Sequence, residues 1–189
     1  MTYLFDLPFE TDAFSSGQIG SKLWLCEEVE KLFDRIDQIW LYGGWYGMTA
    51  FLLRSRNNIK IDKIRSWDID PECERKADML NENWVWREWA FKAYTHDCNL
   101  LQPALMCPDM IINTSTEHFE SMEWWHNIPK GMIVVLQGNN MLHEDHCVDF
   151  DCLETFEKTF PLSQTLYSGQ LDFKYDVGGF SRYMLIGKK

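Results

Sequence analysis

The stretch Gln38-Ile39-Trp40-Leu41-Tyr42-Gly43-Gly44-Trp45-Tyr46-Gly47 decides the fold class of this chain. Its first half is a short apolar run that predicts a buried β-strand, and the residues from Met48 to about Ser55 predict a helix directly after the glycines. Glycine permits the unusual dihedrals of a tight strand-to-helix turn and lets a ligand approach the backbone. Backbone N–H groups at the helix start can receive a carboxylate or a phosphate. Alone, these glycines are equally consistent with a turn that binds nothing.

The alternation of strand and helix continues on both sides of this turn. Helices are predicted at residues 21–33, 71–80 and 153–160, and strands at 63–67, 91–95, 110–112 and 132–136. Residues 166–173 and 182–186, joined by the turn at 176–179, predict an antiparallel hairpin. We therefore expect a Rossmann-like α/β fold: a central, mostly parallel seven-stranded sheet with an antiparallel C-terminal hairpin and helices on both faces.

Acidic residues follow the next two predicted strands. Asp68 comes a little over twenty residues after the glycine turn, close to the spacing at which an acid binds a ribose. Asp70 precedes Pro71 and is expected to cap the following helix, a role that Asp68 could also take. Asp97 ends the third strand, where it could contact an adenine edge. A glycine turn and two acids at successive strand ends form a specific pattern.

This pattern resembles the cofactor motifs of class I S-adenosylmethionine-dependent methyltransferases. The resemblance covers roughly residues 36–189, and the terminal hairpin matches the family's sixth and seventh strands. It implies that the turn lies against the methionine part of S-adenosylmethionine, Asp68 bonds the ribose and Asp97 sits near the adenine. Tyr42 stands where the family usually has an acid. The implied cofactor-binding residues are Gly43, Gly44, Trp45, Tyr46, Gly47, Asp68, Ile69, Asp97 and Asn113.

The end of the fourth strand carries the predicted catalytic residues. In the family this end faces the transferable methyl group, and here it reads Asn113-Thr114-Ser115-Thr116-Glu117-His118. Glu117 and His118 could deprotonate an acceptor hydroxyl or amine, and Asn113 could hold it by its carbonyl. The alternative is that this segment caps the next helix, with Thr114 or Ser115 at the N-cap. The signatures of amino-group and cytosine-C5 DNA methyltransferases are absent from the sequence.

The segment after the fifth strand contains possible metal ligands, His143, Glu144, Asp145 and His146. Imidazole and carboxylate groups bind metals well, but this spacing fits no strong zinc pattern. The ends of strands four and five carry the amides Asn113, Asn139 and Asn140 in positions where a Mg²⁺ site needs carboxylates. We therefore predict no metal and expect a solvated loop.

Composition narrows the partners. The 189 residues carry a formal net charge of −11 and no long cluster of Lys or Arg, so duplex nucleic acid is not expected as a partner. Six scattered cysteines without a C-x-x-C pair indicate reduced thiols and a cytoplasmic setting. Met1–Asp6 lacks the features of a signal peptide, and no apolar run is long enough to span a bilayer.

One domain is expected, with residues 1–35 forming an N-terminal lid and helix and residues 36–189 forming the core. Phe14–Lys22 resembles a mobile lid in which Gln18, Ser21 and Lys22 could reach the cofactor, or it is an ordinary loop with Ser21 as the helix cap.

The predicted function is S-adenosylmethionine-dependent methyl transfer to an O or N nucleophile of a small molecule or a protein side chain. One alternative is a catalytically silent, methyltransferase-like module that binds S-adenosylmethionine or a partner. A Rossmann oxidoreductase is the other, and the terminal hairpin and the lack of a second domain count against it.

Overall fold

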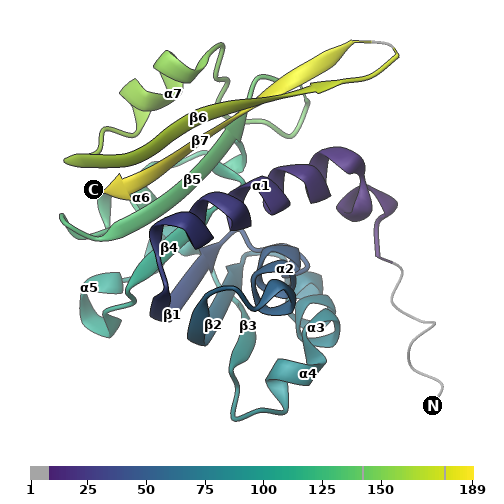
Figure 1. Cartoon of the computed structure of the whole chain (residues 1–189), viewed down its shortest axis with the longest axis vertical. Coiled ribbons are helices and arrows are strands. Elements are labelled where there is room, and N and C mark those ends of the chain that lie inside the picture. Colours follow the sequence, from purple (N-terminus) through teal and green to yellow (C-terminus); the bar gives the residue numbers. More distant parts are fainter. Residues whose placement is uncertain (1–8, 142, 177) are drawn as a thin grey trace.

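The computed structural model describes residues 9–141, 143–176 and 178–189, and its centre is one seven-stranded sheet (Figure 1). The strand order is β3-β2-β1-β4-β5-β7-β6. The first five strands pair in parallel, whereas β7 pairs antiparallel with both β5 and β6. The strands are β1 (Arg35–Tyr42), β2 (Lys60–Asp68), β3 (Phe91–Thr95), β4 (Met110–Asn113), β5 (Ile133–Asn139), β6 (Gln164–Lys174) and β7 (Gly179–Lys188).

Helices cover both faces of the sheet, and each face has its own apolar core. One face packs against helices α1 (Ser16–Leu32), α2 (Met48–Arg56) and α3 (Pro71–Leu80). The other packs against α6 (Glu123–His126) and α7 (Leu153–Thr159) through the aromatic rings of residues such as Trp124 and Phe156. Alternate residues of β1 serve the two cores, Ile39 on the first face and Trp40 on the second. This alternation makes the central strands apolar throughout, as in buried parallel sheets.

The structure confirms the predicted fold class, because all seven strands and the antiparallel hairpin are present. The helix predicted from Met48 and the helix predicted from Pro71 begin at those residues. The remaining elements are short: the 3₁₀ turns η1 (Thr11–Phe14), η2 (Cys98–Leu100) and η3 (Thr116–His118), and the helices α4 (Glu82–Val85) and α5 (Pro103–Met106).

The prediction that Phe14–Lys22 forms a lid or loop is wrong, because helix α1 already begins at Ser16. Ser15 caps it by accepting a hydrogen bond from the Gln18 N–H, whereas Ser21 lies buried inside the helix. The weak helix propensity of its two glycines is offset by packing against the hairpin. A Cβ at Gly20 would lie 2.9 Å from the Phe173 ring, so only glycine lets the two elements approach this closely.

Two sequence-based expectations concern residues without a described placement. Met1–Asp6, from which no signal peptide is predicted, lies outside the described residues. Residue 177 in the turn between β6 and β7 does too. Among the residues that the structure describes, no helix combines the length and the apolar character needed to cross a bilayer.

Candidate functional site

A cleft of about 1150 Å³ opens at the carboxyl ends of the parallel strands. Its wall contains the glycine turn after β1, the first residues after β2 and β3, and the η3 turn after β4. The first turns of α1 and the β7 residue Arg182 line it as well. Because β1 has β2 on one side and β4 on the other, the strand order reverses here. Open α/β sheets bind their ligands at such a switch point.

The glycine turn has the conformation that the sequence predicts. Gly43 and Gly47 have φ angles of +58° and +70°, in the left-handed region that favours glycine. A Cβ on Gly44 would lie 1.9 Å from the Ser66 Oγ, so any larger residue here would force the Ser66 side chain or the turn to move. Gly43, Gly44, Trp45 and Tyr46 line the cleft, whereas Gly47 is the buried N-cap of α2.

Asp68 lies at the end of β2, on the cleft wall beside the glycine turn. One carboxylate oxygen accepts a hydrogen bond from the Trp45 N–H at 2.8 Å, and the other accepts from the Asp70 N–H at 3.1 Å. A carboxylate has about four lone-pair sites, so acceptor capacity remains for a ligand. Burial raises the pKa of Asp68 above its usual value. Ile69 lines the cleft beside it and is 70% exposed.

The structure separates the roles of the neighbouring acids. Asp70 caps α3 by accepting from the Glu72 N–H at 2.9 Å, which confirms its predicted role. Asp97 lines the cleft at the end of β3, and it also accepts from the Asn99 N–H at 2.8 Å. Asp68 and Asp97 therefore share one cleft with the glycine turn, as the family resemblance implies for a bound cofactor.

Asn113 is placed differently from its prediction as a catalytic and cofactor-binding residue. It is fully buried at the end of β4 and is not part of the cleft lining. Its Oδ1 accepts a hydrogen bond from the Ser115 N–H at 2.9 Å, so this oxygen shapes the chain after β4. The alternative of a helix N-cap at Ser115 holds only in part, since η3 follows but the Ser115 side chain makes no capping hydrogen bond.

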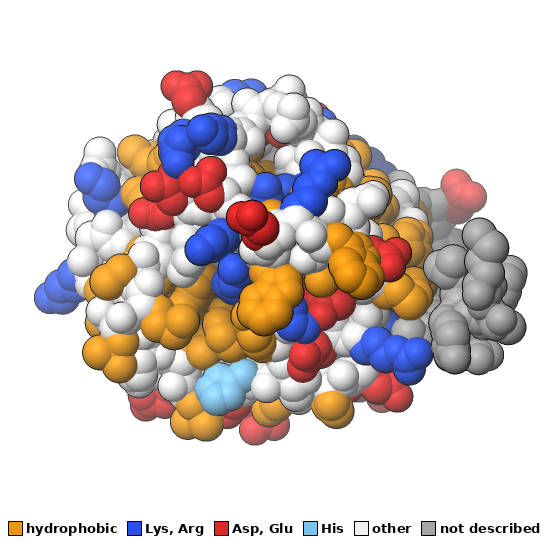
Figure 2. Space-filling view, turned by 90° about the horizontal axis from the view of Figure 1, so that it is seen from below, with side chains coloured by type: hydrophobic (Ala, Val, Ile, Leu, Met, Phe, Trp, Pro, Cys, Tyr) orange, Lys and Arg blue, Asp and Glu red, His pale blue; other side chains and the backbone are white. Residues whose placement is uncertain are grey.

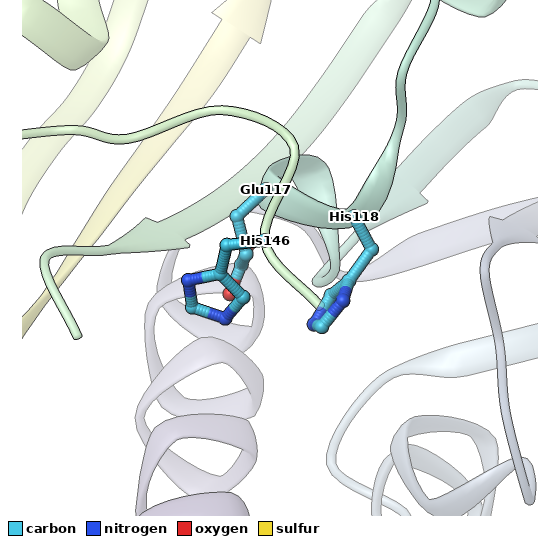
Figure 3. Close-up of side chains that lie close together, drawn as sticks. All are labelled: Glu117, His118 and His146. Atoms are coloured by element: carbon cyan, nitrogen blue, oxygen red, sulfur yellow. The ribbon is translucent and has the colours of Figure 1, made fainter. Parts of the chain in front are cut away.

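Glu117 and His118 both line the cleft, but in different environments. Glu117 is 2% exposed, and its Oε1 accepts a hydrogen bond from the Asn139 Nδ2 and lies 3.5 Å from the Arg182 Nη1. His118 is exposed, and its Nδ1 lies 3.2 Å from the Asp145 carbonyl oxygen. Figure 3 shows both side chains together with His146, which comes from the loop after β5.

Several cleft residues lie far from the sequence motifs. Lys22 and Arg182, 7% and 5% exposed, place two cations near Glu117. Glu10 and Asp12 line the end near Tyr46, whose hydroxyl lies 3.2 Å from a Glu10 carboxylate oxygen. The sequence predicts that Lys22 can reach a cofactor, whereas no local pattern marks Arg182, Glu10 or Asp12. They reach the cleft through the docking of η1 and the pairing of β7 with β5.

Charged side chains of both signs are mixed on one outer face of the molecule. Figure 2 shows Lys and Arg side chains interspersed with Asp and Glu over the face seen from below in Figure 1. A protein surface that neutralises phosphates gathers its basic residues into a continuous patch or stripe. This face has no such continuous basic area.

Comparison with known proteins identifies the fold. No protein-family model and no curated protein sequence matches the chain. Among solved structures, the N-methyltransferase NodS from Bradyrhizobium japonicum, in complex with S-adenosyl-L-homocysteine, aligns over 97% of this chain and 93% of its own, with a TM-score of 0.71 and 11% identity. The magnesium protoporphyrin IX methyltransferase ChlM from Synechocystis, with bound S-adenosylmethionine, covers 95% of this chain and 86% of its own (TM-score 0.63, 10% identity).

YcgJ from Bacillus subtilis covers 90% of this chain and 98% of its own, with a TM-score of 0.61 and 10% identity. Each of these likenesses spans 90% or more of this chain. The chain therefore has the fold of the class I S-adenosylmethionine-dependent methyltransferases. The named activities of NodS and ChlM differ, so the fold does not decide the acceptor.

Proposed function

We propose that this chain is an S-adenosylmethionine-dependent methyltransferase that acts on an oxygen or nitrogen nucleophile of a small molecule or a protein side chain. The observation that carries the proposal is the shared cleft. The glycine turn, Asp68 and Asp97 line one side of it, and Glu117 and His118 line the side after β4. A cofactor wall and a separate polar group for an acceptor are the two parts that methyl transfer needs.

The residues of the cleft fit S-adenosylmethionine. The turn after β1 brings backbone close to the cleft with no Cβ at Gly43 and Gly44. Asp68 keeps acceptor capacity for ribose hydroxyls after its two backbone hydrogen bonds. The family usually binds the methionine ammonium with an acid at the position of Tyr42. Here the carboxylates of Glu10 and Asp12, which line the cleft, can receive it instead. Tyr42 is buried in the second apolar core, which explains why no acid stands there.

The chain's own residues would align the acceptor and manage its proton. When bound, the cofactor supplies an electrophilic methyl group on a sulfonium sulfur. Glu117 and His118 line the acceptor side of the cleft from the η3 turn, which the hydrogen bond from the Thr116 Oγ1 to the Gln137 carbonyl fixes to β5 at 2.8 Å. Holding the acceptor in line with the methyl group lowers the barrier by proximity and orientation.

A catalytically silent module is the second candidate, and the placement of Glu117 favours it. Hydrogen bonding from Asn139 and the nearby Arg182 engage one oxygen of the Glu117 carboxylate in contacts within the fold, a structural role that needs no catalysis. Substituting His118 separates the candidates once an acceptor is known. His118→Ala removes turnover and keeps cofactor binding in an enzyme, whereas a silent module shows no turnover to lose.

Two matched variants at the end of β2 test the cofactor site. Asp68 and Asp70 both accept backbone hydrogen bonds, but only Asp68 lines the cleft. Asp68→Ala is expected to weaken binding of S-adenosylhomocysteine at least about tenfold, or about 1.4 kcal/mol. Asp70→Ala loses a helix cap, which costs about 1 kcal/mol of stability, and keeps the wild-type Kd. Calorimetric titration measures both, and equal affinities of the two variants would contradict the assignment of Asp68.

A further inference from the structure

Three potential metal ligands meet at the acceptor side of the cleft. Glu117 and His118 come from the η3 turn and His146 from the loop after β5 (Figure 3). One potential ligand atom from each side chain lies within 4.8 Å of the other two. All three residues line the same cleft as the glycine turn. The sequence did not predict this set of ligands. It grouped His146 with the neighbouring residues His143, Glu144 and Asp145, and not with Glu117 and His118 of η3.

The backbone holds the two segments together. The Cys147 and Val148 N–H groups donate to the Glu117 carbonyl oxygen at 2.8 and 3.1 Å. The His146 N–H donates to the His143 carbonyl oxygen at 3.1 Å, which closes a turn in the loop just before this contact. These hydrogen bonds fix the backbone on both sides of His146, so the cluster is a built part of the fold.

Two buried atoms in the cluster lack a partner among the residues that the structure describes. Glu117 Oε2 is one, in a side chain that is only 2% exposed, and His146 Nδ1 is the other. In Figure 3 a carboxylate oxygen of Glu117 lies beside the His146 imidazole. Buried polar atoms are normally paired, and leaving one unpaired costs about 1–3 kcal/mol. A bound cation would accept a lone pair from the Glu117 carboxylate and one from the His146 imidazole at once.

The imidazole of His118, the third potential ligand, is also oriented for coordinating a cation. The His118 Nδ1 lies 3.2 Å from the Asp145 carbonyl oxygen, where it donates if it carries the proton. The other ring nitrogen, Nε2, then keeps its lone pair. Histidine ligands of metals are commonly fixed in this way, by a hydrogen bond from the second ring nitrogen to a carbonyl or carboxylate oxygen.

We propose that Glu117, His118 and His146 bind a divalent transition-metal cation such as Zn²⁺ or Fe²⁺. Two imidazoles and one carboxylate suit these metals better than Mg²⁺ or Ca²⁺, which take mainly oxygen ligands. Ligand atoms around tetrahedral Zn²⁺ lie about 3.4 Å apart for bonds of about 2.1 Å, so side-chain rotations of the exposed His118 and half-buried His146 can complete the site. Three protein ligands leave at least one position for the acceptor.

If the chain is a methyltransferase, as proposed above, the cation indicates a hydroxyl group as the methyl acceptor. A hydroxyl group suits the site, because a divalent cation lowers its pKa and the oxygen keeps further lone pairs after coordination. A coordinated amine would give its only lone pair to the metal. In the transfer, the hydroxyl proton leaves to solvent, the new oxygen–carbon bond forms, and the sulfonium sulfur–carbon bond breaks to leave a neutral thioether. Glu117 and His118 thus act on the acceptor through the cation.

Cobalt binding tests the site without any methyl acceptor. Untagged protein, stripped with a chelator, is titrated with Co²⁺ and followed by visible absorption and calorimetry. We expect one equivalent to bind to the wild type, and His118→Ala and His146→Ala each to weaken binding at least tenfold while their melting temperatures stay close to the wild-type value. His126→Ala is the matched control, because His126 is exposed on α6 and is not part of the cluster.

The outcomes separate this inference from the proposed function. No stoichiometric Co²⁺ binding by the wild type, or an equal loss in His126→Ala, would overturn the metal site. S-adenosylhomocysteine is titrated into the same proteins, and His118→Ala and His146→Ala are expected to bind it as the wild type does. Co²⁺ binding without any binding of S-adenosylhomocysteine would leave the metal site standing and remove the proposed function.

Discussion

At the residue scale, the cleft holds two buried cations, Lys22 and Arg182, near one buried carboxylate, Glu117. Burial, the larger cause, and the positive charge of Arg182 together lower the pKa of Lys22 to about 7. The Gln18 side chain accepts a hydrogen bond from the Lys22 ammonium, which only partly replaces the lost hydration. Lys22 therefore destabilises the folded protein whenever it is protonated.

The free energy of unfolding should therefore depend on pH through the protonation of Lys22. Between pH 7 and the ordinary lysine pKa of 10.5, the unfolded chain binds more protons at Lys22 than the folded chain does. The free energy of unfolding therefore rises with pH in this window, by up to about 1.4 kcal/mol per unit. Lys22→Met lacks this contribution, so wild type should gain stability relative to the variant from pH 7.5 to 9.5 in urea denaturation.

Lys31→Met is the control for this experiment, because the Lys31 side chain is 64% exposed. It should follow the wild-type pH profile. Parallel profiles of wild type and Lys22→Met would show that Lys22 keeps an ordinary pKa in the folded protein.

Side-chain roles that depend on a strand end could be predicted from the sequence, and those that depend on distant pairing could not. Asp68 and Asp70 follow β2 directly, so their division into cleft residue and helix cap is visible in the order Asp68-Ile69-Asp70-Pro71. Arg182 enters the cleft only because β7 pairs antiparallel with β5, opposite Asn139. Its partner Glu117 likewise gives no sequence signal of being buried.

At the element scale, the glycine turn and β2 fit together through one contact. Gly44 has an ordinary φ angle, so the demand for glycine there comes from Ser66 alone, whose Oγ would lie 1.9 Å from an added Cβ. The Gly44 N–H also donates to the Trp67 carbonyl oxygen at 3.1 Å, which holds the turn against the strand. The turn is therefore positioned by β2 as much as by β1.

A double-mutant cycle tests this contact. Gly44→Ala should destabilise the protein by about 1–3 kcal/mol, the usual cost of overpacking a filled site. In the Ser66→Ala background the nearest remaining Ser66 atom is Cβ at 3.3 Å, so the same substitution should cost clearly less. Urea denaturation of the four proteins gives the coupling energy. Equal costs in both backgrounds would mean that the turn does not depend on this packing.

Helix α1 shows why the start of an element can escape sequence analysis. Its first turns contain two glycines and several small polar residues, which indicate a loop when judged by propensity. Gly17 and Gly20 instead face the aromatic rings of the terminal hairpin, with Tyr175 Oη 3.0 Å from a Cβ at Gly17. Packing between segments more than 150 residues apart thus decides the conformation, and no local pattern carries that information.

At the scale of the whole molecule, the sheet topology was predictable because its causes are local. Apolar runs that alternate with helical spacing require a parallel sheet, and a tight turn between the last two runs requires an antiparallel hairpin. The placement of polar residues at strand ends then brings Gly43, Asp68, Asp97 and Glu117 into one cleft. The cluster of Glu117, His118 and His146 depends on how a loop folds back onto η3, which the strand pattern does not determine.

The measurement that tests the central claim most directly is calorimetric titration of the wild-type protein with S-adenosylmethionine, S-adenosylhomocysteine and NAD. We predict one-to-one binding of the two sulfur-containing ligands and none of NAD, because the cleft joins the glycine turn, Asp68 and Asp97 within the methyltransferase fold. Absence of binding by both sulfur-containing ligands, or binding of NAD in their place, would contradict the proposal that this cleft serves methyl transfer.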